Sequence, residues 1–133
     1  MDVHRVLFVC RENIGRSQVG AAFYNQLHQG EAESAGINVD IPGQKVGDRP
    51  EAKYTIDVMK RDYNIDISEC RRQRVSQEMK DIYAHIFVMA ELNVIPDWLG
   101  EFPRWNVPDL KGLSEDKTRE TIGDIHSLVS SLV

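Results

Sequence analysis

Residues 6–17 read Val6-Leu7-Phe8-Val9-Cys10-Arg11-Glu12-Asn13-Ile14-Gly15-Arg16-Ser17, and this stretch decides the fold. Its first four residues form a continuous apolar run of strand-forming types, which is typical of a strand buried on both faces. From Ser17 onward, apolar residues recur at helical spacing, and the helix is predicted to end near Gly30. A strand, a tight loop and a helix in this order predict a parallel α/β architecture, in which ligands bind at the carboxyl ends of the strands.

Further strands are expected along the chain. Residues 31–34 are weakly strand-like, and residues 86–89 form a second apolar run that is typical of a buried strand. Between these two segments, residues 35–49 carry three glycines and a proline, and we expect a long irregular loop there. A short strand is predicted from Trp105 to Asp109.

Helices are expected between and after these strands. Pro50 suits a first helical turn, and apolar residues at helical spacing continue to about Tyr63. Residues 91–99 are predicted to form a helix that is interrupted near Pro96, and Ser114 is expected to cap a final amphipathic helix. Since the chain has no internal repeat, low-complexity tract or linker, we predict a single domain over residues 1–133.

Composition indicates the class of protein and its location. A chain of 133 residues with 41% hydrophobic and 28% charged residues is typical of one globular domain. It lacks an apolar run of the roughly 20 residues that a membrane span needs, and its N-terminus does not resemble a signal peptide. The two cysteines lie far apart, which favours reduced thiols. We therefore expect a cytoplasmic protein without a membrane partner.

Charge and residue spacing bear on the partners. A net charge of −5 argues against nucleic acid as a partner. No metal is predicted, because the histidines have no spacing that a metal site would need: His4, His28, His85 and His126. Nothing in the sequence suggests a nucleotide cofactor, so we expect the protein to need no cofactor.

The loop after the first strand has the residues that a phosphate site requires. A phosphate dianion needs converging backbone N–H groups, the positive end of a helix, and a guanidinium that can bind two oxygens. Residues 11–17 would supply the amides, and Arg16 would supply the guanidinium. Cys10 would then face the phosphorus, where the same positive field favours a thiolate. Ser17 can hydrogen-bond this thiolate, and Asn13 tolerates left-handed backbone angles that would brace the loop.

Two alternatives were weighed for this loop. Cys10 could be an ordinary buried residue at a strand end, as free cysteine often is. The arginine and serine at the helix entrance make the nucleophile the better interpretation. A Walker-type nucleotide loop is excluded, because the paired glycines and the lysine before serine or threonine are absent.

Residues 9–17 resemble the active-site loop of the low-molecular-weight protein tyrosine phosphatases and of the arsenate reductases of the same fold. The family pattern is valine, cysteine, any residue, glycine, asparagine, any two residues, arginine and serine. The resemblance covers most of the chain, since four further segments are similar to family motifs: Glu33-Ser34-Ala35-Gly36, Val46-Gly47 with Pro50-Glu51-Ala52, Asn64-Ile65-Asp66-Ile67-Ser68, and Phe87-Val88-Met89. It implies a four-stranded parallel sheet with helices on both faces.

The resemblance also implies a reaction. Asp109 occupies the place of the family's general acid, although an aspartate beside a proline is common in ordinary turns. Cys10 would attack phosphorus, Asp109 would protonate the leaving group, and water would hydrolyse the cysteinyl phosphate while Arg16 and the loop amides hold the oxygens. The expected activity is that of a phosphomonoesterase. Its expected substrate is an aryl phosphate, either on a phosphorylated small molecule or on a phosphotyrosyl protein.

Four positions depart from the family. Glu12 replaces the loop glycine, and it would repel a phosphate dianion if it pointed inward. Gly15 replaces a second loop cysteine, so that the short-range disulfide of other members cannot form. Leu110 replaces a proline, and Lys111 replaces aromatic residues that flank phosphotyrosine in eukaryotic members. Together these changes remove the aromatic walls that hold a phosphotyrosyl ring in eukaryotic members.

Cys70 keeps a second function open. It falls where the family often has a histidine that supports the loop, and a small residue packed under the loop is the plain interpretation. The alternative is a resolving thiol that pairs with Cys10 in an arsenate reductase, which would also need a thiol reductant. A non-catalytic oxyanion-binding module is the third hypothesis, because of Glu12. The basic run Arg71-Arg72-Gln73-Arg74 is expected to be a solvated helix face or to attract acidic substrates.

Overall fold

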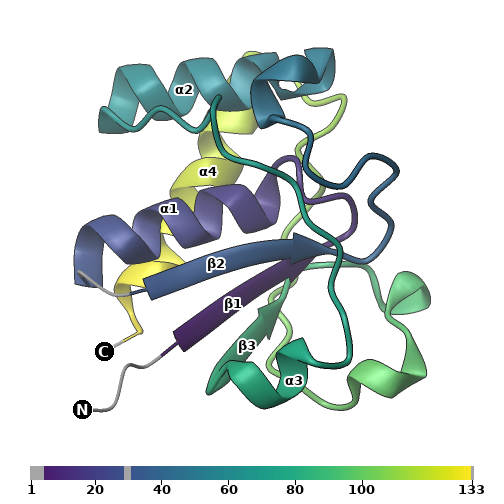
Figure 1. Ribbon diagram of the computed structural model, residues 1–133. Helices are drawn as coiled ribbons and strands as arrows, with labels where there is room; N and C mark the ends of the chain where they lie inside the picture. Colours follow the sequence, from purple (N-terminus) through teal and green to yellow (C-terminus); the bar gives the residue numbers. More distant parts are fainter. Residues whose placement is uncertain (1–4, 29–30, 133) are drawn as a thin grey trace.

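The computed structural model describes residues 5–28 and 31–132, in which three parallel strands form one sheet (Figure 1). The strands are β1 (Arg5–Cys10), β2 (Glu31–Gly36) and β3 (His85–Val88), in the order β2-β1-β3. Both neighbours pair with β1 in parallel. The central place of β1 explains its continuous apolar run, and the prediction of a strand buried on both faces is confirmed.

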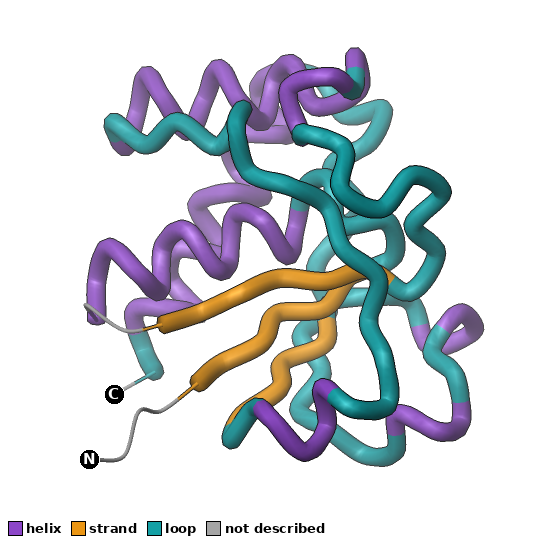
Figure 2. The backbone as a smooth tube through the Cα atoms, in the orientation of Figure 1, coloured by secondary structure: helices purple, strands orange, loops and turns teal. Residues whose placement is uncertain are grey.

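Helices cover both faces of this sheet (Figure 2). The larger layer contains α1 (Arg16–His28), α2 (Lys53–Tyr63) and α4 (Glu115–Ser130). The opposite face carries the short helix α3 (Met79–Ile82) and two 3₁₀ turns, Leu92–Val94 and Asp97–Leu99. The fold therefore has the α/β class expected from the sequence. The predicted end of the first helix near Gly30 lies outside the described residues.

The core is divided by β1 because successive side chains of a strand point to opposite faces. Phe8 is fully buried on the side of α1, where its ring lies 5.6 Å from that of Phe87 and 5.8 Å from that of Trp105, measured between centroids. Leu7 is fully buried in the other cluster, with Leu99 among its members. Each such side chain contributes about 1.5–3 kcal/mol to folding, so that both layers hold the strand that ends in Cys10.

The strand predicted from Trp105 to Asp109 is wrong, and the sheet has three strands rather than four. The structure has instead one parallel bridge, between Val88 and Arg104, just before the predicted segment. The Val88 N–H donates to the Pro103 carbonyl, and the Trp105 N–H donates to the Val88 carbonyl. The Val107 N–H donates to the Trp105 carbonyl and Pro108 has no N–H, so the pairing does not continue past this bridge.

Two predictions about helices had different outcomes. Residues 91–99 do not form a helix; they form the two 3₁₀ turns, since Pro96 lacks an N–H and its ring blocks a continuous α-helix. Ser114 caps α4 as predicted, because its side chain accepts a hydrogen bond from the Lys117 N–H.

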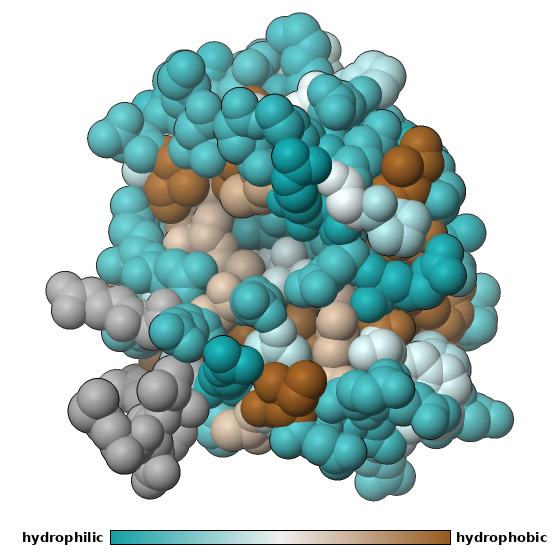
Figure 3. All heavy atoms as spheres, viewed as in Figure 1, coloured by the Kyte–Doolittle hydropathy of each residue, from teal (hydrophilic) through white to brown (hydrophobic). Residues whose placement is uncertain are grey.

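The surface seen in Figure 3 is mainly hydrophilic, and its hydrophobic residues lie in small separate groups. Among the described residues, no helix combines the length and the apolar character that crossing a membrane requires. Nor do the described residues contain a cluster of histidine, cysteine or acidic side chains that could hold a metal ion.

Candidate active site

The loop from Cys10 to Arg16 lies at the carboxyl edge of the sheet, since Cys10 is the last residue of β1 and Arg16 is the first residue of α1. A cavity opens there to solvent. It brings together residues of three segments, among them the three residues predicted to be catalytic, and its lining is Cys10, Glu12, Ile14, Gly15, Arg16, Glu51, Thr55, Asp109, Leu110 and Lys111. No aromatic ring is present in this described lining.

The backbone of this loop offers unpaired donors. None of the N–H groups of residues 11–18 donates a hydrogen bond to another described residue, and the first that does is Val19, to the Gly15 carbonyl. Buried N–H groups are nearly always paired, so a row without acceptors at the start of a helix favours an anion. Arg11 is exposed, whereas Ile14 is buried and lines the cavity.

The candidate nucleophile has one hydroxyl partner. Cys10 is 3% exposed, and its Sγ lies 3.0 Å from Ser17 Oγ. Asn13 Nδ2 donates to the same Ser17 oxygen at 2.7 Å and to Ser34 Oγ at 2.9 Å. Since the Ser17 oxygen already accepts from Asn13, its own proton is available to Cys10 sulfur. This arrangement stabilises a thiolate and a departing sulfur.

Asn13 organises the back of the loop. Its backbone is left-handed, with φ of 58°, a conformation that asparagine tolerates better than most residues. Its Oδ1 accepts a hydrogen bond from the Gln73 N–H at 2.8 Å. Gly36 lies against the same backbone, because a Cβ at this position would stand 2.7 Å from Asn13 N and 2.8 Å from the Glu12 carbonyl carbon. The glycine therefore permits the loop to pack directly on the end of β2.

Arg16 joins the loop to two other segments. Its guanidinium is 2% exposed, and Nη1 donates to the carbonyls of Met89 at 2.6 Å and Val107 at 3.0 Å and to Glu91 Oε1 at 2.9 Å. Neither Nε nor Nη2 donates a hydrogen bond to a described residue, which leaves one edge of the fork for two anion oxygens. Nη2 lies 3.9 Å from Asp109 Oδ2.

Glu91 was missed by the sequence analysis, although it follows β3 at the edge where ligands bind. Burial is the largest single effect and raises the pKa of the Glu91 carboxyl. The hydrogen bond from Arg16, a backbone hydrogen bond and the charges of Arg16 and Arg11 together outweigh it and hold this pKa below its ordinary value. Its second oxygen, Oε2, is buried without a hydrogen-bond partner among the described residues. Glu91 thus aligns Arg16 and balances part of its charge.

Asp109, the candidate general acid, stands on the loop that leads to α4. Its side chain is 41% exposed, and Oδ1 accepts a hydrogen bond from the Lys111 N–H at 3.1 Å. Because the Arg16 fork contacts the Val107 carbonyl, the loop that carries the acid is held beside the loop that carries Cys10.

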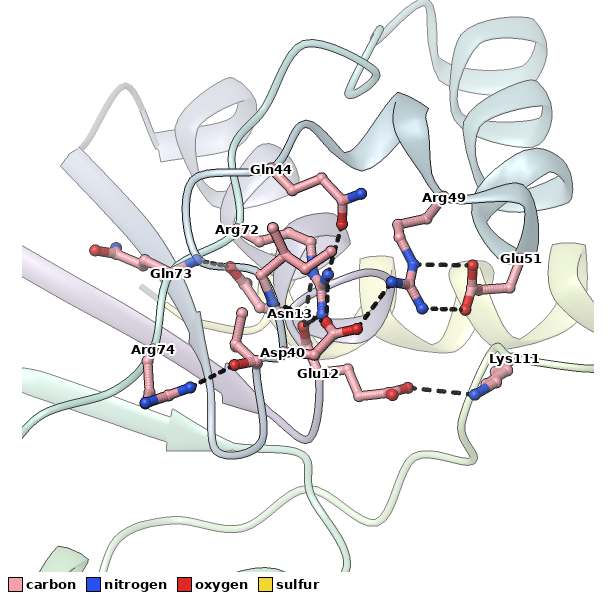
Figure 4. Close-up of polar contacts among 12 residues, drawn as sticks. Glu12, Asn13, Asp40, Gln44, Arg49, Glu51, Arg72, Gln73, Arg74 and Lys111 are labelled. Carbon is pink, nitrogen blue, oxygen red and sulfur yellow. Dashed lines mark hydrogen bonds and ion pairs between the residues drawn. The ribbon is translucent and has the colours of Figure 1, made fainter.

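The Glu12 carboxylate lies at the rim of the cavity, where Lys111 Nζ is 3.8 Å from its Oε2 (Figure 4). A second carboxylate of the wall, Glu51, is held by a bidentate pair with Arg49 at 3.1 and 2.9 Å. The Arg49 hydrogen bond keeps the pKa of Glu51 below its ordinary value although burial acts in the opposite direction. Each of these carboxylates therefore has a cation beside it, which weakens their repulsion of an anion.

Two departures from the family pattern lie in contact. A Cβ on Gly15 would stand 3.0 Å from Leu110 Cδ1 and 3.2 Å from Leu110 Cβ. A cysteine at position 15 would crowd this leucine, so glycine and leucine fit each other where the family often has cysteine and proline.

Cys70 does not pack under the loop, and that expectation is wrong. The thiol is free and exposed, and it lines a different cavity together with Gln18 and Arg71. Burial of part of the side chain raises the pKa of the Cys70 thiol. The group that supports Asn13 is the backbone of Gln73, whose side chain also donates to the Ser34 carbonyl at 2.9 Å. Because almost every residue type has a backbone N–H, the sequence could not show that position 73 supports Asn13.

Comparison with known proteins agrees with this geometry. The family model described as low molecular weight phosphotyrosine protein phosphatase matches residues 5–133. No curated protein matches the chain. Among solved structures, a low-molecular-weight protein tyrosine phosphatase from T. tengcongensis has 23% identity and a TM-score of 0.74, with 96% of each chain covered.

Two further solved structures are similar. Wzb from Vibrio vulnificus in complex with benzylphosphonate has 20% identity and a TM-score of 0.79, with 98% of this chain and 97% of that chain covered. An arsenate reductase in the phosphate-binding state has 26% identity and a TM-score of 0.76, with 96% of this chain and 95% of that chain covered.

Proposed function

The chain belongs to the low-molecular-weight phosphotyrosine protein phosphatase family, and we propose that it is a phosphomonoesterase with Cys10 as its nucleophile. One observation carries the proposal. Cys10 Sγ stands in a loop whose N–H groups from residue 11 to residue 18 have no acceptor among the described residues. Arg16 and Asp109 line the same cavity.

In the first step, the Cys10 thiolate attacks the phosphorus atom. A sulfur–phosphorus bond forms as the bond to the ester oxygen breaks, and Asp109 donates its proton to the departing oxygen. The loop amides and the free edge of the Arg16 fork hold the three remaining oxygens. The Val107 contact of Arg16, at 3.0 Å, keeps the acid loop next to the bound phosphoryl group.

In the second step, water attacks the cysteinyl phosphate. Asp109, now ionised, takes the proton from this water, and the sulfur–phosphorus bond breaks. The Ser17 hydroxyl, 3.0 Å from the sulfur, donates a hydrogen bond to the thiolate that leaves. Phosphate and the free enzyme result. This chemistry needs a reduced thiol, which supports a cytoplasmic location.

The substrate is proposed to be an aryl phosphate, either a phosphorylated small molecule or a phosphotyrosyl protein. The described wall has no aromatic ring to hold a phenyl group, and Lys111 and Thr55 stand in it instead. We therefore expect weak discrimination between aryl groups.

Arsenate reduction is the second candidate, because the chain is 26% identical to an arsenate reductase over 96% of its length. The same thiolate would attack arsenic. Since Cys10 and Cys70 line different cavities, an external thiol would have to complete the reaction.

Hydrolysis of p-nitrophenyl phosphate under reducing conditions tests the proposal. Wild-type turnover that vanishes in Cys10→Ser and persists in Cys70→Ser is the expected result. Absence of turnover in the wild type would refute the phosphatase proposal, and arsenite formation from arsenate and glutathione would then support the second candidate.

A further inference from the structure

The basic run from Arg71 to Arg74 is neither a helix nor a free basic patch. Its backbone bridges to Lys45 at one end and to Gly36 at the other. Arg71 Nη1 donates to the Gly43 carbonyl at 2.7 Å, and Arg74 Nη2 donates to the Val39 carbonyl at 2.7 Å. The expectation of a solvated helix face is therefore wrong. These two guanidinium groups fasten the loop between β2 and α2.

Arg72 differs from its neighbours because it is buried and reaches the loop of Cys10. The residue is 1% exposed, and Nε and Nη2 donate to the Glu12 carbonyl at 3.2 and 3.0 Å (Figure 4). Nη1 lies 2.8 Å from Gln44 Oε1 and 2.8 Å from Asp40 Oδ1. A buried guanidinium normally requires such a complete set of acceptors.

Asp40 completes this set as a permanent anion. The hydrogen bond from Arg72 is the largest effect on the pKa of the Asp40 carboxyl. Burial opposes it, but with the further contribution of Arg49 the pKa of this carboxyl is lowered to about 2. The acceptors of Arg72 therefore do not change their charge in the range where enzymes are assayed.

The two contacts with the Glu12 carbonyl fix the orientation of one peptide unit. In a trans peptide the carbonyl and the following N–H point in opposite directions, so the Asn13 N–H is turned to the side of the loop away from Arg72. That N–H has no acceptor among the described residues. The next residue of the basic run, Gln73, holds the Asn13 side chain at 2.8 Å. The neighbouring residues Arg72 and Gln73 thus hold the neighbouring loop residues Glu12 and Asn13.

We infer that Arg72 is a positioning residue, which aligns the Glu12–Asn13 peptide so that the loop amides converge on a bound phosphoryl group. The inference rests on the proposed function, since it concerns the same anion site. Arg72 itself does not line the cavity and acts through the Glu12 carbonyl. A purely structural role would affect stability alone, whereas a positioning role affects anion affinity and the amide signals of the loop.

The test is binding of inorganic phosphate to the reduced protein, measured by calorimetry and by the amide shifts of residues 11–18. Arg72→Met should weaken phosphate binding by at least about tenfold and reduce the Asn13 amide shift on phosphate addition. Arg74→Met is the matched control, because it removes a guanidinium of the same segment whose hydrogen bond among the described residues goes to the Val39 carbonyl and not to the Cys10 loop. It should change the affinity by less than about twofold.

Two further variants separate geometry from charge and protect the test against misfolding. Arg72→Lys keeps the charge but not the paired donors, so it should recover only part of the affinity. The double variant Asp40→Ala with Gln44→Ala leaves Arg72 in place without its anchors, and it should bind phosphate about threefold more weakly. This variant decides the question if Arg72→Met does not fold.

The outcomes distinguish the two proposals. Equal phosphate affinity in wild type and in a folded Arg72→Met, or full affinity in Arg72→Lys, would overturn the positioning role while the anion site stands. If Arg72→Met is unfolded, equal affinity in the double variant has the same meaning. A wild type that binds no phosphate would overturn the proposed function and this inference with it.

Discussion

Gly36→Ala should disturb both the stability and the candidate site, because the space for its methyl group is occupied by loop backbone. The added Cβ would lie 2.7 Å from Asn13 N, about 0.7 Å short of the 3.4 Å at which ordinary van der Waals contact begins. The Val39 side chain, whose Cγ2 would also lie 2.7 Å away, could rotate, but Asn13 N and the Glu12 carbonyl carbon at 2.8 Å belong to the main chain. Either β2 or the loop must move by several tenths of an ångström.

The magnitude follows from this overlap. Overpacking of a buried position costs about 1–3 kcal/mol, and for a chain of 133 residues a loss of 2 kcal/mol lowers Tm by about 6–10 °C. Displacement of the loop amides should lower phosphate affinity and kcat/KM by about tenfold or more. Urea denaturation, calorimetric phosphate binding and p-nitrophenyl phosphate hydrolysis measure these three effects.

Gly123→Ala is the matched control. Gly123 lies within α4, and nothing stands within 4 Å of its added Cβ, so the same substitution should stabilise the protein by about 0.5–1 kcal/mol without changing activity. A Gly36→Ala protein with wild-type stability would refute the overlap argument. Lost stability with unchanged phosphate affinity would show that β2, and not the loop, absorbs the strain.

Three further predictions follow from contacts around the cavity. Ser17→Ala removes the hydroxyl 3.0 Å from Cys10 Sγ, so hydrolysis of the cysteinyl phosphate should slow by about tenfold or more. Stopped-flow assays should then show a burst of p-nitrophenol, and linear product formation at the wild-type rate would contradict this prediction. The pKa of Glu91 is lowered in the folded state from its ordinary value of 4.5, so the ionised carboxylate stabilises the fold above that pH. In urea denaturation, the free energy of unfolding of wild type should exceed that of Glu91→Gln by a constant amount near pH 7, and this difference should shrink as pH falls below about 4.5. A difference that grows on acidification would contradict the assignment. Gly15→Ala should reduce activity by crowding Leu110, and Leu110→Ala in the same chain should restore part of it; additive losses in the double variant would show that the two sites are independent.

Local patterns were sufficient to predict the segment that carries the chemistry. The apolar run of β1, the loop after Cys10 and the start of α1 are contiguous, so each is visible in the residues themselves. The cap of α4 was predicted for the same reason, since Ser114 and its partner Lys117 are close in the chain. Such features depend on propensities and hydrogen bonds within a few residues.

Local patterns failed where pairing partners are distant. The strand predicted from Trp105 shrank to one bridge, because ladder formation depends on which N–H groups face Val88 and not on strand propensity. Residues 91–99 failed for a local reason, because Pro96 separates two 3₁₀ turns where one kinked helix was predicted.

The support of the candidate site depends on long-range contacts. Arg72 lies 60 positions from Glu12 and Glu91 lies 75 positions from Arg16, yet both pairs are hydrogen-bonded in the fold. In the sequence, Arg72 is one of several basic residues and cannot be distinguished from Arg74. The residue type states which hydrogen bonds a side chain can make, and only the packing of distant segments determines which buried acceptors are left for it to satisfy.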